Sequence, residues 1–147
     1  MENKLQFYID GKWVDPVVPK TLEVIDPSNE EPFARISMGS KADVDKAVAA
    51  ARRAFETWSR TSKEERLALM GKIVEVYQKR YGDIVQAISR EMGAPLGLSK
   101  NAQAAMGIAH FTQAMKVLKD FEFEKVEGST AIVREPVGVV GMITPWN

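Results

Sequence analysis

The chain has 147 residues with 20 basic and 20 acidic side chains, a formal net charge of zero and a hydrophobic fraction of 45%. These are the proportions of an ordinary globular protein, and because no segment concentrates charge of one sign, we expect no nucleic-acid partner. The sequence contains no cysteine, which excludes disulfides, thiolate metal sites and a thiol nucleophile within these residues.

Membrane and export signals are also missing from the sequence. No apolar run reaches the length of about 18 residues that suggests a membrane span. The first residues, Met1 to Lys4, lack the basic start and apolar stretch of a secretory signal. We therefore expect a cytoplasmic protein that binds no membrane.

The first 40 residues predict short strands joined by tight turns. Residues 5–9 and 12–14 flank Asp10 and Gly11, the dipeptide that a type I′ hairpin turn favours because both central residues need positive φ. Residues 22–25 predict another strand, and residues 32–37 its return partner. Elements this small must pack onto something larger.

Two long amphipathic helices and a shorter one come next. Ser40 with Asp43 predicts the first helix start, and Ser62 with Glu65 forms a full capping box for the second. Gly82 is expected to stop the second helix. Apolar residues at three-and-four spacing predict one buried face on each long helix: Val44, Ala47, Val48, Ala51, Phe55 and Trp58 on the first, and Leu67, Met70, Ile73, Val74, Tyr77 and Tyr81 on the second.

Asp83 with Gln86 predicts the start of the shorter helix, which Gly93 and Pro95 end. A further helix is expected over residues 99–119, with a face of alanines and methionines. Such a face suits either tight packing on a neighbouring helix or the wall of a channel. His110, the only histidine, is given no role.

The last segment changes character. Residues 130–134 predict a strand, and residues 137–143 form a nearly continuous apolar run that fits a strand buried on both faces. Ligands of α/β sheets bind beyond the carboxyl ends of strands, which is where residues 144–147 would lie. There the Asn147 amide could stabilise a developing oxyanion. The alternative is a strand end closed by Trp146, with Asn147 beginning the next turn.

Several segments, in order, carry a resemblance to one family. Residues 134–147, REPVGVVGMITPWN, closely resemble the segment that ends at the catalytic asparagine of the aldehyde dehydrogenase superfamily. Residues 9–13, 24–28, 42–51 and 91–95 are similar to other parts of its N-terminal region, together with Trp58, Glu65 and Arg66. The likeness covers nearly the whole chain.

The resemblance implies oxidation of an aldehyde to a carboxylate, with NAD or NADP as cofactor and a small-molecule aldehyde as substrate. A cysteine thiolate would attack the aldehyde to give a thiohemiacetal, and a glutamate would activate water. Asn147 matches the oxyanion-binding asparagine, whereas Ile143, Thr144, Pro145 and Trp146 match positions that line the cofactor. The family's cysteine and glutamate lie beyond residue 147, so the chain alone is predicted to be inactive.

Two further positions are suggested by the same resemblance. Glu91 matches a carboxylate that helps some members bind a monovalent cation with backbone carbonyls near Val24 and Ile25; a solvated glutamate near a helix end is the alternative. Ala94 stands where the family usually has lysine. The helix that holds Met106 to Met115 corresponds to one wall of the family's substrate tunnel.

The implied fold class is α/β, the N-terminal part of a Rossmann-type cofactor domain with a β oligomerisation arm. Residues 1–117 would be the N-terminal part of the NAD(P)-binding domain, residues 118–136 the bridging arm and residues 137–147 the first strand of the nucleotide-binding sheet. The catalytic domain would be absent from this chain, and the whole enzyme would be a homodimer or homotetramer.

Two rival interpretations remain open. In one, the chain is a non-catalytic binding or assembly module that dimerises through its β arm. In the other, the family is right but the parent enzyme is an acylating or semialdehyde-specific member. An unpaired apolar strand also predicts that the isolated chain self-associates.

Overall fold

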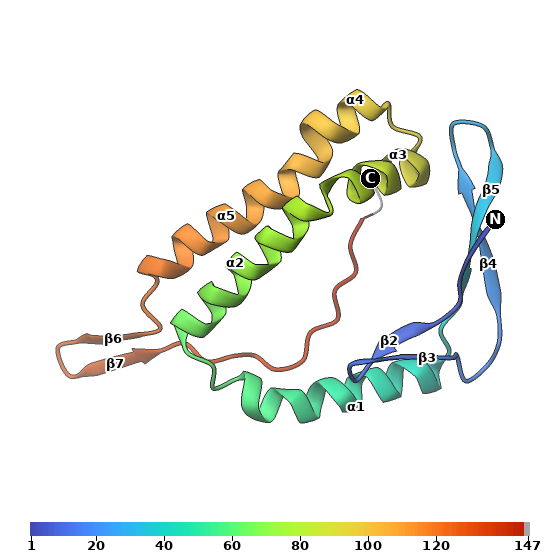
Figure 1. Ribbon diagram of the computed structural model, residues 1–147. Coiled ribbons are helices and arrows are strands. Elements are labelled where there is room, and N and C mark those ends of the chain that lie inside the picture. Colours follow the sequence, from blue (N-terminus) through green and yellow to red (C-terminus); the bar gives the residue numbers. More distant parts are fainter. Residues whose placement is uncertain (146–147) are drawn as a thin grey trace.

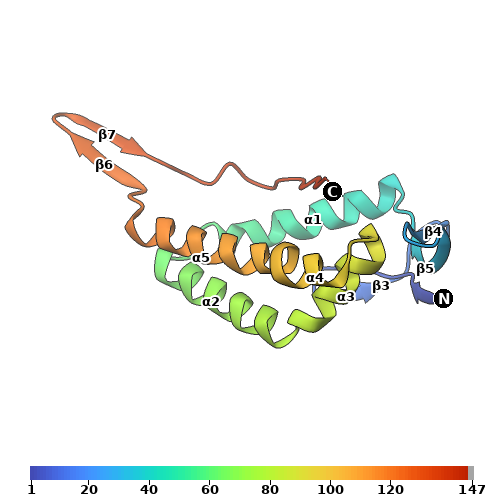
Figure 2. The same cartoon turned by 90° about the horizontal axis from the view of Figure 1, so that it is seen from above.

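The computed structural model describes residues 1–145, and within them short strands lie at the two ends of the molecule with helices between (Figures 1 and 2). The strands are β1 (Glu2–Lys4), β2 (Phe7–Ile9), β3 (Lys12–Val14), β4 (Thr21–Asp26), β5 (Glu31–Ser37), β6 (Glu124–Glu127) and β7 (Thr130–Val133). The helical segments are α1 (Lys41–Trp58), α2 (Lys63–Lys79), α3 (Tyr81–Met92), α4 (Leu96–Leu98), the π-helical turn η1 (Ser99–Gln103) and α5 (Ala104–Asp120).

The first hairpin has the predicted turn. Strands β2 and β3 pair antiparallel, and Asp10 and Gly11 between them have φ angles of 54° and 74°. Positive φ at both positions is what a type I′ turn requires. Across the strands, the rings of Tyr8 and Trp13 meet edge to face with centroids 5.2 Å apart.

Strands β4 and β5 pair antiparallel as predicted, and β1 adds parallel to β5, so the sheet order is β1-β5-β4. Strand β1 was not predicted, because its three residues are polar and show no alternation. The β4–β5 turn is closed by Asp26, whose carboxylate accepts hydrogen bonds from the Ser28 hydroxyl at 2.6 Å and the Ser28 N–H at 2.8 Å. These bonds stabilise the anion and lower the pKa of Asp26.

Helix α1 begins at Ser40 as predicted, but its apolar stripe is not a buried face. Val44 is 57% exposed and Trp58 51% exposed, whereas Asp43 and Ala50 are the buried residues of this helix. The spacing places these apolar residues on one side of the helix, as predicted. Within residues 1–145, however, that side has little to pack against, since β2 is the main element in contact with α1. The prediction of burial was therefore wrong for this chain.

Asp43 anchors the start of α1. Its carboxylate accepts from the N–H of Ser40 at 2.8 Å, the hydroxyl of Ser40 at 2.7 Å and the N–H of Val17 at 2.9 Å. Hydrogen bonds to the anion, chiefly from Ser40, lower the pKa of Asp43. One side chain thus caps a helix and holds the loop between β3 and β4.

The capping box of α2 is confirmed: Ser62 accepts from the Glu65 N–H, and the Glu65 carboxylate accepts from the Ser62 N–H. Gly82 does not stop this helix. The break falls at Arg80, with φ −103° and ψ 16°, and Gly82 lies inside α3. Glycine ends a helix by adopting positive φ, which Gly93 does at the end of α3 with φ 67°.

Helices α2 and α5 run antiparallel and form the main helical contact of the described chain (Figure 1). The Tyr77 ring lies against the backbone of Gly107, where an added Cβ would be 2.6 Å from Tyr77 Cζ and 2.8 Å from its Cε2. The Tyr77 hydroxyl donates to the Ala104 carbonyl at 2.8 Å. Burial raises the pKa of Tyr77, with Tyr81 adding to the effect. The tight-packing interpretation of the alanine- and methionine-rich helix is therefore correct at Gly107.

Strands β6 and β7 form a separate antiparallel hairpin that projects from one end of the molecule (Figure 2). The strand predicted at residues 130–134 is confirmed over Thr130–Val133. Residues 134–145 form no strand, because no neighbouring strand within the described chain offers them a backbone to pair with. Their assignment to a nucleotide-binding sheet stays a prediction.

Within residues 1–145 no helix combines the length and the apolar character needed to cross a membrane.

Replacing Gly107 with alanine tests the α2–α5 contact. Alanine normally stabilises a helix by about 1 kcal/mol relative to glycine, but here its methyl group collides with Tyr77, so G107A should destabilise the chain by ~1–3 kcal/mol. Urea unfolding measures the change in stability for G107A and for the control variant G82A. The G82A methyl group would lie in open space on α3, so this variant should be as stable as the parent or more stable. A G107A variant as stable as the parent would show that the two helices do not meet this way.

The charge on Asp43 makes stability depend on pH. Because its folded pKa is lowered from 3.8, its contribution is present above that value and disappears as pH falls through the folded pKa. D43N should therefore lower the thermal midpoint at pH 7, and the difference from wild type should vanish in acid. D45N, which changes an exposed carboxylate on the same helix, serves as the control. A D43N defect of equal size at pH 7 and at about pH 2 would contradict this role.

Candidate functional site

The residues predicted to line the cofactor lie at the end of the described chain. Ile143, Thr144 and Pro145 are all exposed, Ile143 to 98%. Trp146 and the predicted catalytic Asn147 lie outside the described residues. The structure therefore does not test the cofactor and oxyanion roles assigned to this segment.

The segment that leads to these positions passes over α1. Gly138 and Val139 are its half-buried residues, and a Cβ added to Gly138 would lie 3.7 Å from Nη1 of Arg52. Gly138 has φ 118°, a conformation that favours glycine. Beyond this contact the segment runs back towards the end of the molecule that holds β1 to β5 (Figure 1). Residues 143–145 are thus brought back along the helical layer.

A cavity of about 690 Å³ lies between the β1-β5-β4 sheet and α3. Glu91 and Val24 both line this cavity. Its lining comprises Glu2, Lys4, Val24, Phe33, Ala34, Ile36, Asp83, Gln86, Ala87, Arg90 and Glu91. Charged and apolar groups therefore share this cavity.

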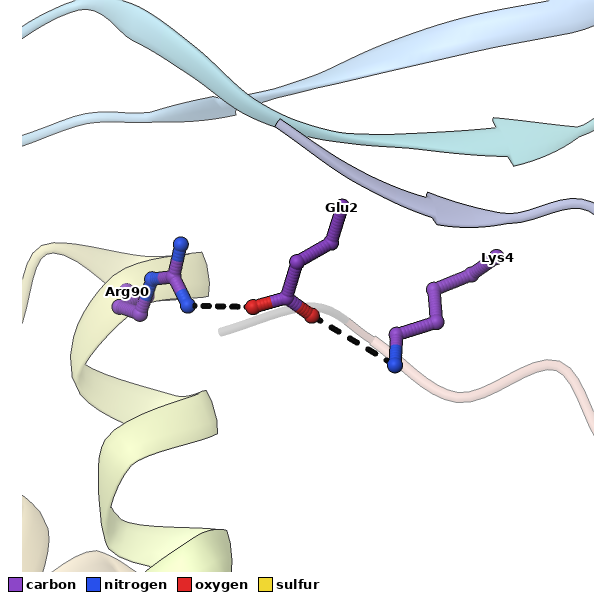
Figure 3. Close-up of polar contacts among 3 residues, drawn as sticks. All are labelled: Glu2, Lys4 and Arg90. Atoms are coloured by element: carbon purple, nitrogen blue, oxygen red, sulfur yellow. Dashed lines mark hydrogen bonds and ion pairs between the residues drawn. The ribbon is translucent and has the colours of Figure 1, made fainter.

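Three charged side chains meet in the cavity, with Glu2 between Arg90 and Lys4 (Figure 3). Nη1 of Arg90 donates to Oε1 of Glu2 at 2.9 Å, and the Arg90 guanidinium carbon lies 4.5 Å from the centroid of the Phe33 ring. The other oxygen of Glu2 lies 3.5 Å from Nζ of Lys4. The hydrogen bond from Arg90, followed by that from Lys4, lowers the pKa of Glu2. Arg90 thereby ties β1 and β5 to α3.

The side chains around Glu91 do not make a metal site by themselves. Among residues 1–145 no group of three or more histidine, cysteine, aspartate or glutamate residues could hold a metal ion. Lys4 and Arg90 line the same cavity and would repel a cation. The cation role of Glu91 therefore stays a prediction.

A second, apolar groove of about 580 Å³ lies in the angle between α2 and α3. Leu69, Ile73 and Val76 line it and are exposed. The helical spacing predicted a buried face for Ile73, but within residues 1–145 that part of the helix has no cover. The predicted stripe of α2 contained Ile73 but neither Leu69 nor Val76, so the sequence analysis did not predict this groove.

Tyr77, Tyr81 and Arg90 had no predicted role beyond helix packing or charge. The two tyrosines bond to main-chain carbonyls of the neighbouring helix, and Arg90 bonds to a strand 88 residues away in sequence. No local pattern marks such partners. A tyrosine pair at i and i+4 was the only available signal.

Comparison with known proteins agrees with this architecture. Residues 13–147 match the sequence profile of the aldehyde dehydrogenase family. The 3-succinoylsemialdehyde-pyridine dehydrogenase of a Pseudomonas species is 47% identical over 148 residues, which cover 100% of this chain and 31% of that protein. This chain thus spans about a third of the length of such relatives.

Solved structures give the same result. An aldehyde dehydrogenase from Bartonella henselae matches 88% of this chain and 28% of its own, with 50% identity and a TM-score of 0.85. Betaine aldehyde dehydrogenase from Staphylococcus aureus, in complex with NAD+, matches 98% of this chain and 30% of its own, with 32% identity and a TM-score of 0.89. The described residues have the fold of the N-terminal part of an aldehyde dehydrogenase, which confirms the predicted α/β class.

The chain belongs to the aldehyde dehydrogenase family.

The exposed apolar segment that ends the described chain should make the isolated chain self-associate. Val137 is 91%, Met142 88% and Ile143 98% exposed, and contiguous apolar surface of this kind favours association in water. Sedimentation velocity at micromolar concentration should show species larger than a monomer. The triple variant V137K/M142K/I143K should shift them towards monomer, whereas lysine at the exposed positions Ala42, Ala49 and Gln78 should not. A compact wild-type monomer would overturn the expectation.

Proposed function

We propose that this chain is the N-terminal portion of an enzyme that oxidises an aldehyde to a carboxylate with NAD or NADP. The observation that carries the proposal is the family match over residues 13–147, which includes the whole segment from Arg134 to Asn147. The solved structures that resemble this chain include a mutant of aldehyde dehydrogenase C from Pseudomonas syringae, 44% identical, crystallised with NAD+ and octanal. We transfer the type of cofactor, a nicotinamide dinucleotide, and the type of substrate, an aldehyde, from these relatives to the enzyme that contains this chain.

When bound, the dinucleotide accepts the hydride of the reaction. In this proposal Ile143, Thr144, Pro145 and Trp146 line its binding site. The exposure of residues 143–145 supports the assignment, because they remain free to meet a ligand or the rest of the enzyme. Proline fixes the local backbone, and tryptophan offers a flat apolar wall.

Asn147 is proposed to donate its side-chain amide to the oxyanion that forms when a cysteine thiolate attacks the aldehyde. A donor of this kind lowers the barrier by roughly 3 kcal/mol. This chain contains no cysteine, so in this proposal another part of the whole enzyme supplies the attacking cysteine, and by the family resemblance also the water-activating glutamate. The chain alone would then hold part of the site and perform no turnover.

Helix α5, which holds Met106 to Met115, is proposed to supply one wall of the aldehyde tunnel from its side away from α2, where Met106 lies; Met115 instead packs towards α2, with Cε 3.8 Å from a Cβ added at Gly71. Met106 is half exposed, and Gly107 and Ala104 beside it keep the helix close to α2. A flexible methionine such as Met106 suits an apolar substrate. The name of the semialdehyde dehydrogenase relative favours a semialdehyde-specific parent as the nearest alternative.

The β6–β7 hairpin, within the predicted arm of residues 118–136, is proposed to join subunits of the whole enzyme. Its residues are all exposed, Val126 to 74%, and its outer edges are unpaired within the described chain. Such edges pair readily with another copy. The same feature supports the rival class, a non-catalytic assembly module, so catalysis has to be tested directly.

The test measures NADH production by the full-length protein that carries these residues and by this chain alone. We expect turnover with the former and none with the latter. In the full-length protein N147A should reduce kcat by about 10²–10³-fold with NAD+ affinity retained, whereas Q78A, an exposed amide on α2, should leave kcat unchanged. A full-length protein that oxidises no aldehyde would favour the assembly module. Turnover by this chain would show that the cysteine is dispensable.

A further inference from the structure

The helical run from Leu96 to Asp120 contains one irregular turn, η1. The Ala104 N–H donates to the carbonyl of Ser99, five residues back. In an α-helix it would instead bond to the carbonyl of Lys100, four residues back. Because of the π turn, the Lys100 carbonyl does not receive the hydrogen bond from the Ala104 N–H that it would receive in an α-helix. Single π turns within α-helices occur frequently at functional sites.

Tyr81 supplies the donor that the turn removes. Its hydroxyl donates to the Lys100 carbonyl from the first residue of α3. Tyr77, at the end of α2, donates to the Ala104 carbonyl at 2.8 Å, and the two rings are 6.3 Å apart. The α2–α3 junction thus places one hydroxyl at each end of the irregular turn.

The turn is also fixed from its inner side. Ser99 and Ala104, at its two ends, are both 0% exposed. Just after it, Gly107 receives the Tyr77 ring. A helix has about 100° between successive residues, so the residue accommodated by a π turn changes the rotation of α5 relative to α4. Holding or releasing η1 therefore decides which side chains α5 presents.

We propose that Tyr81 is a positioning residue for substrate specificity: by holding the Lys100 carbonyl it maintains the π turn and sets the rotation of α5, and with it the direction of the half-exposed Met106. The specificity part rests on the proposed aldehyde dehydrogenase function, whereas the clamp itself does not. Without the hydroxyl, the Ala104 N–H can return to Lys100 as in a regular helix. The face of α5 then turns, and the fit of a long aldehyde suffers more than that of a short one.

The first measurement is amide hydrogen exchange by mass spectrometry over residues 96–108, on this chain and on the full-length protein. Y81F should speed exchange in that region by about fivefold, the effect of one ordinary hydrogen bond. Y77F is the matched control. It also removes a tyrosine hydroxyl, but that hydroxyl bonds to the Ala104 carbonyl, which does not lose its helical N–H donor to the π turn. Unchanged exchange in Y81F, or an equal change in Y77F, would overturn the clamp.

The second measurement compares propanal and octanal as substrates of the full-length protein. Y81F should raise KM for octanal by about fivefold while kcat for propanal stays unchanged, whereas a general loss of stability would lower activity with both aldehydes alike. Equal effects on both substrates, or none, would overturn the specificity role. A full-length protein that oxidises neither aldehyde would defeat the proposed function and the specificity role together, and the exchange measurement would still decide the clamp.

Discussion

The contact between the Tyr77 ring and the Gly107 backbone sets the spacing of the helical half of this chain. With no Cβ at Gly107, α2 and α5 approach until the aromatic ring covers the main chain, and the tyrosine hydroxyl reaches the Ala104 carbonyl. The buried apolar residues of the described chain are small, namely Ala34, Ala50, Val85 and Ala104. Close helix packing thus supplies order where residues 1–145 bury few large side chains.

A second anchor joins the helices to the strands. Arg90 on α3 holds Glu2 by an ion pair and lies over the ring of Phe33, so one side chain contacts two strands of the sheet. At half exposure such a pair contributes little by itself in water. Its importance is geometric, because it keeps β1 beside β5 and gives the cavity at Glu91 its charged wall.

Local rules predicted the local elements well. The positive φ of Asp10 and Gly11, the capping boxes at Ser40 and Ser62 and the left-handed Gly93 all follow from residue type and nearest neighbours. Two predictions failed for different reasons. The stripe of α1 lies exposed because its burial depends on a partner, whereas Gly82 lies within α3 because it does not adopt the positive φ that ends a helix. The clamp of Tyr81 on Lys100 could not be predicted, since a π turn leaves no mark in apolar periodicity. The position of the candidate site followed from resemblance rather than from physics, and its key amide at Asn147 lies outside the described residues.

The parallel pairing of β1 with β5 means that the first few residues after Met1 are structural. Glu2, Asn3 and Lys4 align with Ala34, Arg35 and Ile36, and Glu2 also carries the ion pair to Arg90. Parallel neighbours cannot be joined by a short turn, and the connection from β1 to β5 here contains β2, β3 and β4. An affinity tag fused directly ahead of Met1 would therefore crowd a sheet edge, and a flexible spacer or a tag elsewhere suits this protein better.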